Sequence, residues 1–499
     1  MEVEIDICRF QPPEYFMAKR ALFKGRQNEI TRLLNVTKKN VASFVVVKGR
    51  RRVGKSRLID EYSKYFEKYY KFEGLAPEKN ITAMQQLEEF SSQISRQFKT
   101  ANASYNNWSD ALWAIGERVQ TGKCLLFFDE LSWMGNKDTT FLAKIKSFWD
   151  NQLSKNHELV FIVCSSASAW IEKNLLSSTA FVGRVSFTIT LEELPLVDCN
   201  KFWPDNISAY EKFKILSVTG GIPKYLEEIN PKECAEENIK QLCFTDGGFL
   251  VMEFKRIFSD LFLRNSEFYK KIIAVLAAGS KEQSEIQAEI CKKDDQQHYG
   301  RIPEYLWELE EAGFIRRDYS WDIRTGKDSR ISQYRLQDNY LRFYIKYIEK
   351  NLGKIKRSAF NFKSLTSLLE WNAIMGYQFE NLILNNRQVI HKILGLTADE
   401  IICENPYFQK PNKRLPGCQI DYMIQTKFSC LYICEIKFSK NKIDGTVIKE
   451  LKEKINALKF PRGFSYRPVL IHVNGVSDDV IDDDYFYAII DMAQLLEPF

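Results

Sequence analysis

The sequence predicts an α/β protein made of three modules, and three observations carry this prediction. Short apolar runs at residues 43–47, 124–128 and 159–164 alternate with amphipathic helical stretches, including residues 81–98 and 140–153. This alternation of strand-like and helical segments is typical of a parallel sheet. Helices followed by two short strands come next, and a second α/β pattern closes the chain. The expected modules span residues 1–265, 266–353 and 354–499.

Length and composition exclude several other classes of protein. A chain of 499 residues is too long for one hydrophobic core, and 45% hydrophobic residues exclude wholesale disorder. The net charge of +6 is too mild to demonstrate nucleic-acid binding. No apolar run approaches the roughly 18 residues that span a bilayer. Acidic residues near Met1 argue against a secretory leader, so we expect a cytoplasmic protein without a membrane partner. We expect its cysteines to be free thiols.

A glycine-rich loop directly follows the first expected strand and precedes a helical pattern over residues 57–69. It fits the pattern G-x-x-x-x-G-K-[ST] with Gly49, Arg50, Arg51, Arg52, Val53, Gly54, Lys55 and Ser56, and Arg57 comes next. Glycines let the backbone N–H groups turn toward phosphates, Lys55 reaches the β and γ phosphates, and the Ser56 hydroxyl ligates Mg²⁺. The motif predicts ATP and Mg²⁺ as cofactors.

Two carboxylates end the second expected strand. Asp129 would hold the Mg²⁺ shell, and Glu130 would polarise the attacking water. The two motifs together predict an ATPase, although a P-loop fold can also serve as a binding switch without turnover.

Polar side chains elsewhere in this module could also act on the phosphates. Ser165 and Ser166 end the third expected strand, where they could sense the γ phosphate or the water. Arg184 could reach a phosphate within its own chain or from a neighbouring subunit, so a homo-oligomer stays open. Ordinary surface polarity is the alternative for each.

Several segments together resemble the archaeal-type ATPase family, which belongs to the AAA+/STAND region of P-loop proteins. They are residues 23–29 (FKGRQNE), the arginine-rich loop, Phe127–Glu130, Cys164–Ser166 and Gly220–Pro223. The resemblance covers roughly residues 20–270. It implies that Gly25 and Arg26, together with Gly221 and Pro223, flank the nucleotide base.

The sequence predicts a winged helix for the middle module. Helical patterns at residues 285–290 and 299–311 precede expected strands at 314–320 and 331–336. The expected hairpin is basic, with Arg316, Arg317, Arg324, Lys327 and Arg330. A recognition helix with a basic wing could read nucleic acid, and DNA is preferred over RNA as the partner. The alternative is a packing arm that regulates the ATPase, and residues 334–343 resemble the segment that closes this module in the same family.

The last module brings carboxylates and a lysine onto one expected hairpin. A long helix is expected through residues 364–393, with strands near 420–424, 431–436 and 469–472. Glu435 and Lys437 are two residues apart, so they share a face of their strand. Asp421 on the adjacent strand joins them, and Glu380 on the helix completes the set. Such a group could hold Mg²⁺ and orient water for phosphodiester cleavage, and a surface salt-bridge set is the alternative.

These residues resemble the PD-(D/E)xK nuclease superfamily, whose domains have the restriction-endonuclease-like fold. Residues 376–380 (GYQFE) resemble the helix motif of the nuclease-like domain often fused to this ATPase, although Gln419 stands where many relatives carry an acid. The sequence thus predicts an ATP-hydrolysing protein that acts on nucleic acid and carries a Mg²⁺-dependent nuclease-like domain. A nucleotide-dependent switch and a DNA-binding regulator remain as alternatives.

Overall fold

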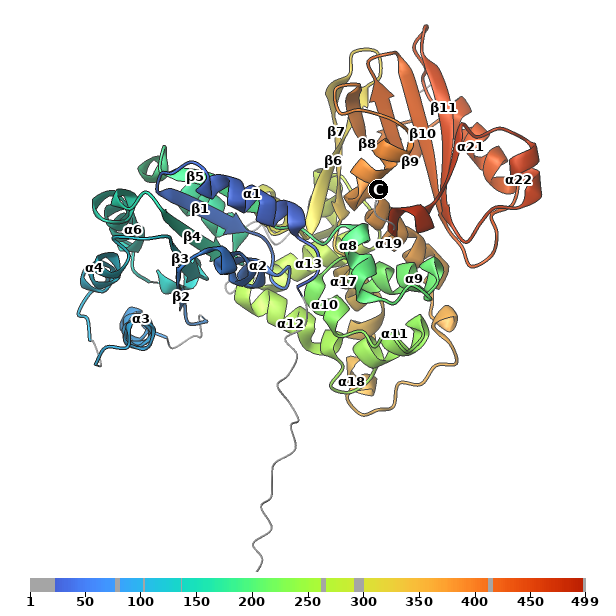
Figure 1. Ribbon diagram of the computed structural model, residues 1–499. Helices are drawn as coiled ribbons and strands as arrows, with labels where there is room; N and C mark the ends of the chain where they lie inside the picture. The colour runs from blue at the N-terminus through green and yellow to red at the C-terminus, as the bar shows by residue number, and fades with distance from the viewer. Residues whose placement is uncertain are drawn as a thin grey trace, which may run out of the picture.

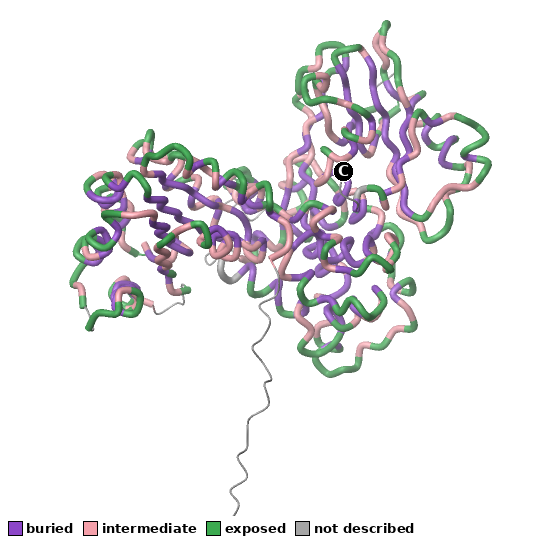
Figure 2. The backbone as a smooth tube through the Cα atoms, viewed as in Figure 1, coloured by how far each residue is buried: buried purple, intermediate pink, exposed green. Residues whose placement is uncertain are grey.

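The computed structural model describes residues 23–76, 81–101, 104–135, 137–261, 266–290, 300–411 and 416–496. Two lobes, each built on a five-stranded sheet, join through a body of helices (Figure 1). Buried residues are concentrated in both sheets and in the helices between them (Figure 2). Residues 1–22, on which the expectation of a chain without a leader rests, lie outside the described residues. Within the described ranges, no helix is long and apolar enough to cross a membrane.

The first sheet is parallel throughout, with the strand order β2-β3-β4-β1-β5. Its strands are β1 (Ser43–Lys48), β2 (Lys68–Glu73), β3 (Cys124–Asp129), β4 (Leu159–Ser165) and β5 (Val185–Thr190). The parallel sheet confirms the predicted α/β class. Because β4 lies between β1 and β3, the C-terminal ends of these three strands meet at one edge of the sheet.

Helices cover both faces of this sheet. One face, including Val45 and Phe127, packs against α1 (Gln27–Thr37) and α2 (Lys55–Tyr62). The other face packs against α3 (Ala83–Phe98), α4 (Trp108–Arg118) and α6 (Phe141–Asn151). The short helices of this lobe are α5 (Leu131–Met134) and α7 (Ser168–Ile171).

The helix expected over residues 57–69 is shorter than predicted. It ends at Tyr62, and Tyr69 lies in β2 at the edge of the sheet. The β2 sequence KYYKFE is mostly half-buried, so it lacks the continuous apolar run that marks the inner strands.

A body of helices follows the first sheet. It consists of α8 (Leu196–Cys199), α9 (Ala209–Thr219), α10 (Pro223–Glu227), α11 (Ala235–Phe244), α12 (Phe249–Leu261) and α13 (Ser266–Ala277). The chain continues through α14 (Gln283–Ile290) and α16 (Ile302–Glu311) into the hairpin of β6 (Ile315–Asp322) and β7 (Lys327–Leu336). Tyr299, the expected start of the second helix, lies outside the described residues.

The hairpin packs against the second sheet. Trp321 is buried, and its Nε1 donates a 2.6 Å hydrogen bond to Oε1 of Gln425. The Ser320 hydroxyl donates to the carbonyl of Phe408 at 2.9 Å, and the Trp321 ring meets the Tyr407 ring edge-on. These contacts join the hairpin to the C-terminal lobe.

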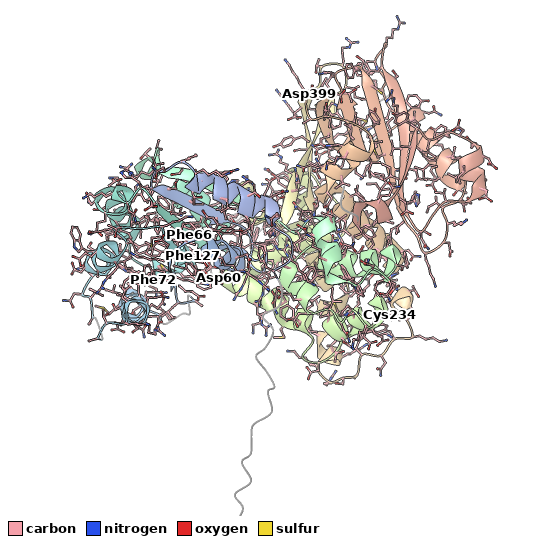
Figure 3. The ribbon with its side chains drawn as sticks, viewed as in Figure 1. Asp60, Phe66, Phe72, Phe127, Cys234 and Asp399 are labelled. Atoms are coloured by element: carbon pink, nitrogen blue, oxygen red, sulfur yellow. The ribbon has the colours of Figure 1, made fainter. Side chains whose placement is uncertain are left out.

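The second sheet is mixed, with the strand order β12-β11-β10-β9-β8. Strands β8 to β10 pair antiparallel, and β10 to β12 pair parallel. The strands are β8 (Ile401–Gln409), β9 (Cys418–Thr426), β10 (Cys430–Phe438), β11 (Ser465–Val473) and β12 (Ala488–Asp491). Phe72 and Phe127 lie in the first lobe, and Asp399 lies in the second, just before β8 (Figure 3).

Helices on both faces complete the second lobe. The face that carries Tyr422 and Cys434 packs against α19 (Trp371–Asn385), and the opposite face packs against α21 (Thr446–Ala457). The remaining helices are α17 (Asn339–Phe343), α18 (Leu352–Ile355), α20 (Arg387–Ile393) and α22 (Asp478–Asp482). The helix expected through residues 364–393 begins only at Trp371 and breaks at Asn386, whose Oδ1 accepts a hydrogen bond from the backbone N–H of Leu196.

Candidate functional site

The backbone of the phosphate loop, between β1 and α2, requires glycine at both motif positions. Gly49 has φ +149°, and a Cβ there would lie 2.4 Å from the carbonyl oxygen of Leu191. Gly54 has φ +91° and caps the N-terminus of α2. Only glycine adopts such conformations beside neighbouring backbone without strain. Ser56 follows in the first turn of α2.

Lys55 lies inside the loop rather than in solvent. Its side chain is buried, and Nζ donates to the carbonyl oxygens of Gly49 at 2.7 Å and Arg50 at 3.1 Å. Burial raises the pKa of the nearby Cys164 thiol well above its usual range, Asp129 and Glu130 raise it further, and Lys55 opposes them. The loop lysine and both carboxylates therefore lie within electrostatic reach of one thiol.

Asp129 and Glu130 each have specific partners at the edge of the sheet. Cys164 donates its S–H to Oδ1 of Asp129, with Sγ and Oδ1 2.8 Å apart, and Lys71 Nζ lies 3.3 Å from Oδ2. Oε2 of Glu130 accepts hydrogen bonds from the backbone N–H and the hydroxyl of Ser166, at 2.8 and 3.0 Å. Ser166, proposed from the sequence as a phosphate or water sensor, thus holds the Glu130 carboxylate.

Two loop arginines are anchored outside the first sheet. Arg50 is buried and forms an ion pair with the buried Asp338, which follows β7. Arg52 Nε lies 2.8 Å from Oε1 of Glu253 on α12. Arg51 is half-buried, and Glu130 is close enough to influence its pKa, which burial lowers. The loop is therefore clamped to the helical body and to the hairpin.

The residues expected to flank the nucleotide base meet beside the loop. Arg26 is buried, and its NH2 group donates to the carbonyl oxygen of Val53 at 3.1 Å. The N–H of Gly221 donates to Oε2 of Glu193 at 2.9 Å. Gly25, with φ +75°, approaches the carboxylate of Asp198 closely. A pocket opens here, lined by Phe23, Lys24, Arg26, Val53, Gly54, Arg57, Phe202, Pro223 and Glu227.

Arg184 lies just before β5, at the N-terminal ends of the strands, whereas the phosphate loop lies at their C-terminal ends. Val185 pairs with Phe44 near the start of β1, whereas the loop leaves from Lys48 at its end. Arg184 instead forms a two-point ion pair with Asp150, at 2.7 and 2.8 Å, and donates to the carbonyl oxygen of Ala180. The suggestion that Arg184 reaches a phosphate of its own chain is therefore wrong, because the parallel register separates them by the length of the strand.

The C-terminal carboxylates and lysine gather on the α21 side of the second sheet. Glu435 is buried, and its Oε1 lies 3.0 Å from Nζ of Lys437. Asp421 accepts a 2.9 Å hydrogen bond from the backbone N–H of Ile436. Lys454 on α21 joins them, with Nζ 2.6 Å from Oε2 of Glu435 and 3.5 Å from Oδ1 of Asp421.

Glu380 on α19 lies within electrostatic range of this group. Burial raises its pKa to about 8, with Asp421 adding to the rise and Arg335 opposing it. Burial also raises the pKa of Asp421 to about 6, and the charge of Glu435 adds to that rise. Among the described residues, however, no three or more His, Cys, Asp or Glu side chains form a group that could hold a metal. Glu380, Asp421 and Glu435 therefore do not converge as a ready ligand set.

Sequence reasoning missed the partners that complete both groups. Asp338 is 288 positions from Arg50, and Lys454 is 33 positions from Asp421. Lys71 lies on β2, a strand that the apolar pattern did not mark. The one available signal was the position of Lys454, three residues after the buried Leu451 on the amphipathic α21.

Comparison with known proteins supports an ATPase domain in the first lobe. Residues 23–229 match a family model described as an ATPase domain predominantly from Archaea. An uncharacterized protein of Methanocaldococcus jannaschii is 26% identical over 369 residues, which cover 72% of this chain and 76% of that protein.

Two solved structures align over about two thirds of this chain. A Walker-type ATPase of Pyrococcus abyssi aligns with a TM-score of 0.46 at 16% identity, over 65% of this chain and 96% of its own. The ORC2 protein of Aeropyrum pernix aligns with a TM-score of 0.42 at 12% identity, over 68% of this chain and 95% of its own. At these scores, neither alignment bears on ligands or partners.

The Arg50–Asp338 pair generates a prediction about stability. Asp338→Asn keeps an oxygen for the Leu341 N–H that Asp338 now caps, but leaves the buried Arg50 charge with only the more distant Glu193, 3.8 Å away, as its counterion. The local stability of α17 should fall by about 3–5 kcal/mol, because breaking one side of a buried pair is costly. Hydrogen exchange of the α17 amides measures this change. Arg50→Gln added to Asp338→Asn should restore part of the lost stability. Asp328→Asn, a change at an exposed acid, should have no effect. Unaltered α17 exchange in Asp338→Asn would contradict the prediction.

Proposed function

We propose, from the premise of an archaeal-type ATPase domain over residues 23–229, that this chain binds ATP with Mg²⁺ at the phosphate loop and hydrolyses it. One observation carries the proposal. The loop follows β1, Asp129 ends β3 and Glu130 comes directly after it at the same edge, and Ser166 follows β4, the strand between them.

The loop residues suit a triphosphate. Backbone N–H groups between Gly49 and Gly54, and those that begin α2, suit phosphate oxygens. The Lys55 ammonium, now bonded to loop carbonyl oxygens, has the charge and reach to contact the β and γ phosphates. The hydroxyl of Ser56 and the carboxylate of Asp129 are the oxygen donors that Mg²⁺ prefers, and the bound ion would neutralise charge on the phosphates.

Glu130 is the best candidate to polarise the attacking water. Its carboxylate follows the strand next to β4, and Ser166 fixes its direction through two hydrogen bonds. A carboxylate held this way can accept a proton as water attacks the γ phosphorus. Phe23, Arg26 and Pro223 line a small cavity beside the loop and offer apolar and cationic surface to the base.

Lys55→Ala should abolish most ATP binding, because it removes the ammonium that would contact the β and γ phosphates while keeping both loop glycines. Isothermal titration calorimetry with ATP and Mg²⁺ measures the loss, which we expect to exceed about tenfold in Kd. Lys64→Ala, an exposed lysine just after α2, is the matched control. ATP affinity at the wild-type level in a folded Lys55→Ala protein would remove the proposed binding role.

Glu130→Gln should separate binding from turnover. The amide keeps the shape and can still bond to Ser166, but it cannot take a proton, so ATP affinity should persist while hydrolysis falls by about 100-fold or more. Phosphate release under single-turnover conditions measures the rate. Glu158→Gln, an exposed acid at the opposite edge of the sheet, is the control. Hydrolysis at the parent rate would assign the water to another residue.

A second candidate function is metal-dependent cleavage of nucleic acid in the C-terminal lobe. It is favoured by the order α19-α20-β8-β9-β10-α21-β11 and by the contacts that bring Asp421, Glu435 and Lys437 together on the α21 side of a mixed sheet. The acids offer the hard oxygens that Mg²⁺ prefers, and Lys437 can orient water or stabilise charge on a phosphate.

The alternatives are a nucleotide-dependent switch and a DNA-binding regulator. The bridge between Lys281 and Tyr334 beside the hairpin supports the winged-helix reading of the middle module.

Asp421→Ala and Glu435→Ala should abolish metal-dependent cleavage while sparing ATP hydrolysis, because these acids lie in the other lobe. Lys437→Ala should keep metal binding and lose cleavage rate. Cleavage of single- and double-stranded DNA and RNA, with Mg²⁺ or Mn²⁺ and with or without ATP, measures the effect. Glu453→Ala, exposed on α21, is the control. A wild-type chain that cuts none of these substrates would leave the switch in its place.

A further inference from the structure

Helix α21 brings a second lysine to the Asp421–Glu435 pair. The helix packs on the second sheet through Val447, Ile448, Leu451 and Ile455. Lys454 lies at the border of this apolar face, with about a third of its side chain exposed. From this border its ammonium reaches Asp421 within β9 and Glu435 within β10.

The Lys454 ammonium contacts both acids at once. Nζ lies 2.6 Å from Oε2 of Glu435 and 3.5 Å from Oδ1 of Asp421. The other oxygen of Asp421 accepts the N–H of Ile436. Glu435 and Asp421 would be the acids that hold a metal here, and both carboxylates now face this ammonium.

Lys437 occupies a different place in the group. Its Nζ lies 3.0 Å from the other oxygen of Glu435, Oε1, and 2.8 Å from Glu450, an acid that is about half exposed. The Lys437 charge opposes the rise in the pKa of Asp421, but Asp421 forms its ion pair with Lys454. Lys437 therefore lies on the outer side of Glu435, and Lys454 lies between the two acids.

We propose that Lys454 is the resident cation of the Asp421–Glu435 pair, and that a divalent metal must displace its ammonium to bind there. The inference rests on the proposed metal-dependent function of this lobe. Two neighbouring carboxylates need a positive charge between them, and an ammonium supplies it. An ammonium and a divalent ion on the same two oxygens would repel each other strongly, so only one can occupy the place.

Titration of the nucleotide-free full-length chain with Mn²⁺, followed by electron paramagnetic resonance of the free ion, tests this. Glu435→Gln identifies the binding that belongs to this pair of acids. Lys454→Met should bind Mn²⁺ there roughly tenfold more tightly than the parent chain, because the competing charge is gone. Lys454→Arg should keep the parent affinity. Lys449→Met, an exposed lysine on the same helix, should also change nothing.

A second readout guards against a variant that folds poorly. Without metal, Lys454→Met should melt at a lower temperature than the parent, since Glu435 stays buried without its nearest cation, and Mn²⁺ should restore the loss. Lys454→Gln, which can still donate a hydrogen bond to Glu435, should show the same gain in Mn²⁺ affinity with a smaller loss of stability.

The outcomes separate this inference from the proposed cleavage. If the parent binds Mn²⁺ through Glu435 and neither neutral variant binds it more tightly, Lys454 is no competitor and the metal site stands. If the neutral variants bind more tightly but no form of the protein cuts nucleic acid, the inference stands and cleavage fails. If neither the parent nor the neutral variants bind Mn²⁺ through Glu435, both fail.

Discussion

The buried ion pair between Arg50 and Asp338 is the constraint on which the arrangement of the three parts depends. It joins the phosphate loop to the residue that follows β7, and both side chains are almost fully enclosed. A buried guanidinium without a counterion would cost several kcal/mol, so the loop and the base of the hairpin are held together. Lys48 reinforces the junction, with Nζ 2.8 Å from Glu311 on α16. The phosphate loop is thus held in place partly by residues of the middle module.

Hydrogen bonds continue from Asp338 toward the second sheet. Asp338 caps α17, and the adjacent Asn339 exchanges two hydrogen bonds with the backbone and side chain of Gln378 on α19, at 3.0 and 2.6 Å. Asn381, one turn further along α19, donates to the carbonyl oxygen of Leu336. The same helix carries Glu380. A chain of buried polar contacts therefore connects the phosphate loop to α19. Such contacts are costly to break singly.

In each proposed metal site, one carboxylate is paired with a lysine from a separate element. Lys71 on β2 lies beside Asp129, and Lys454 on α21 lies beside Glu435. Both acids are almost fully buried, and a buried carboxylate requires a compensating charge. Neither lysine belongs to the motif that identified its partner. The charge balance of each site is therefore a property of the fold and not of the local sequence.

The sequence alone determined the parallel α/β class of the first lobe, the phosphate loop and the strand that ends in Asp129, because each depends on neighbours within a few residues. Continuous apolar runs marked the inner strands, whereas the half-buried β2 gave no such run. Only the tertiary structure decided where side chains met partners far along the chain. In the structure, Arg184 pairs with Asp150 at the end of the sheet away from the phosphate loop, and Glu130 is hydrogen-bonded to Ser166. Asp338 pairs with Arg50, and Lys454 pairs with Glu435. Strand register and helix packing fix such pairings, and periodicity carries no record of either.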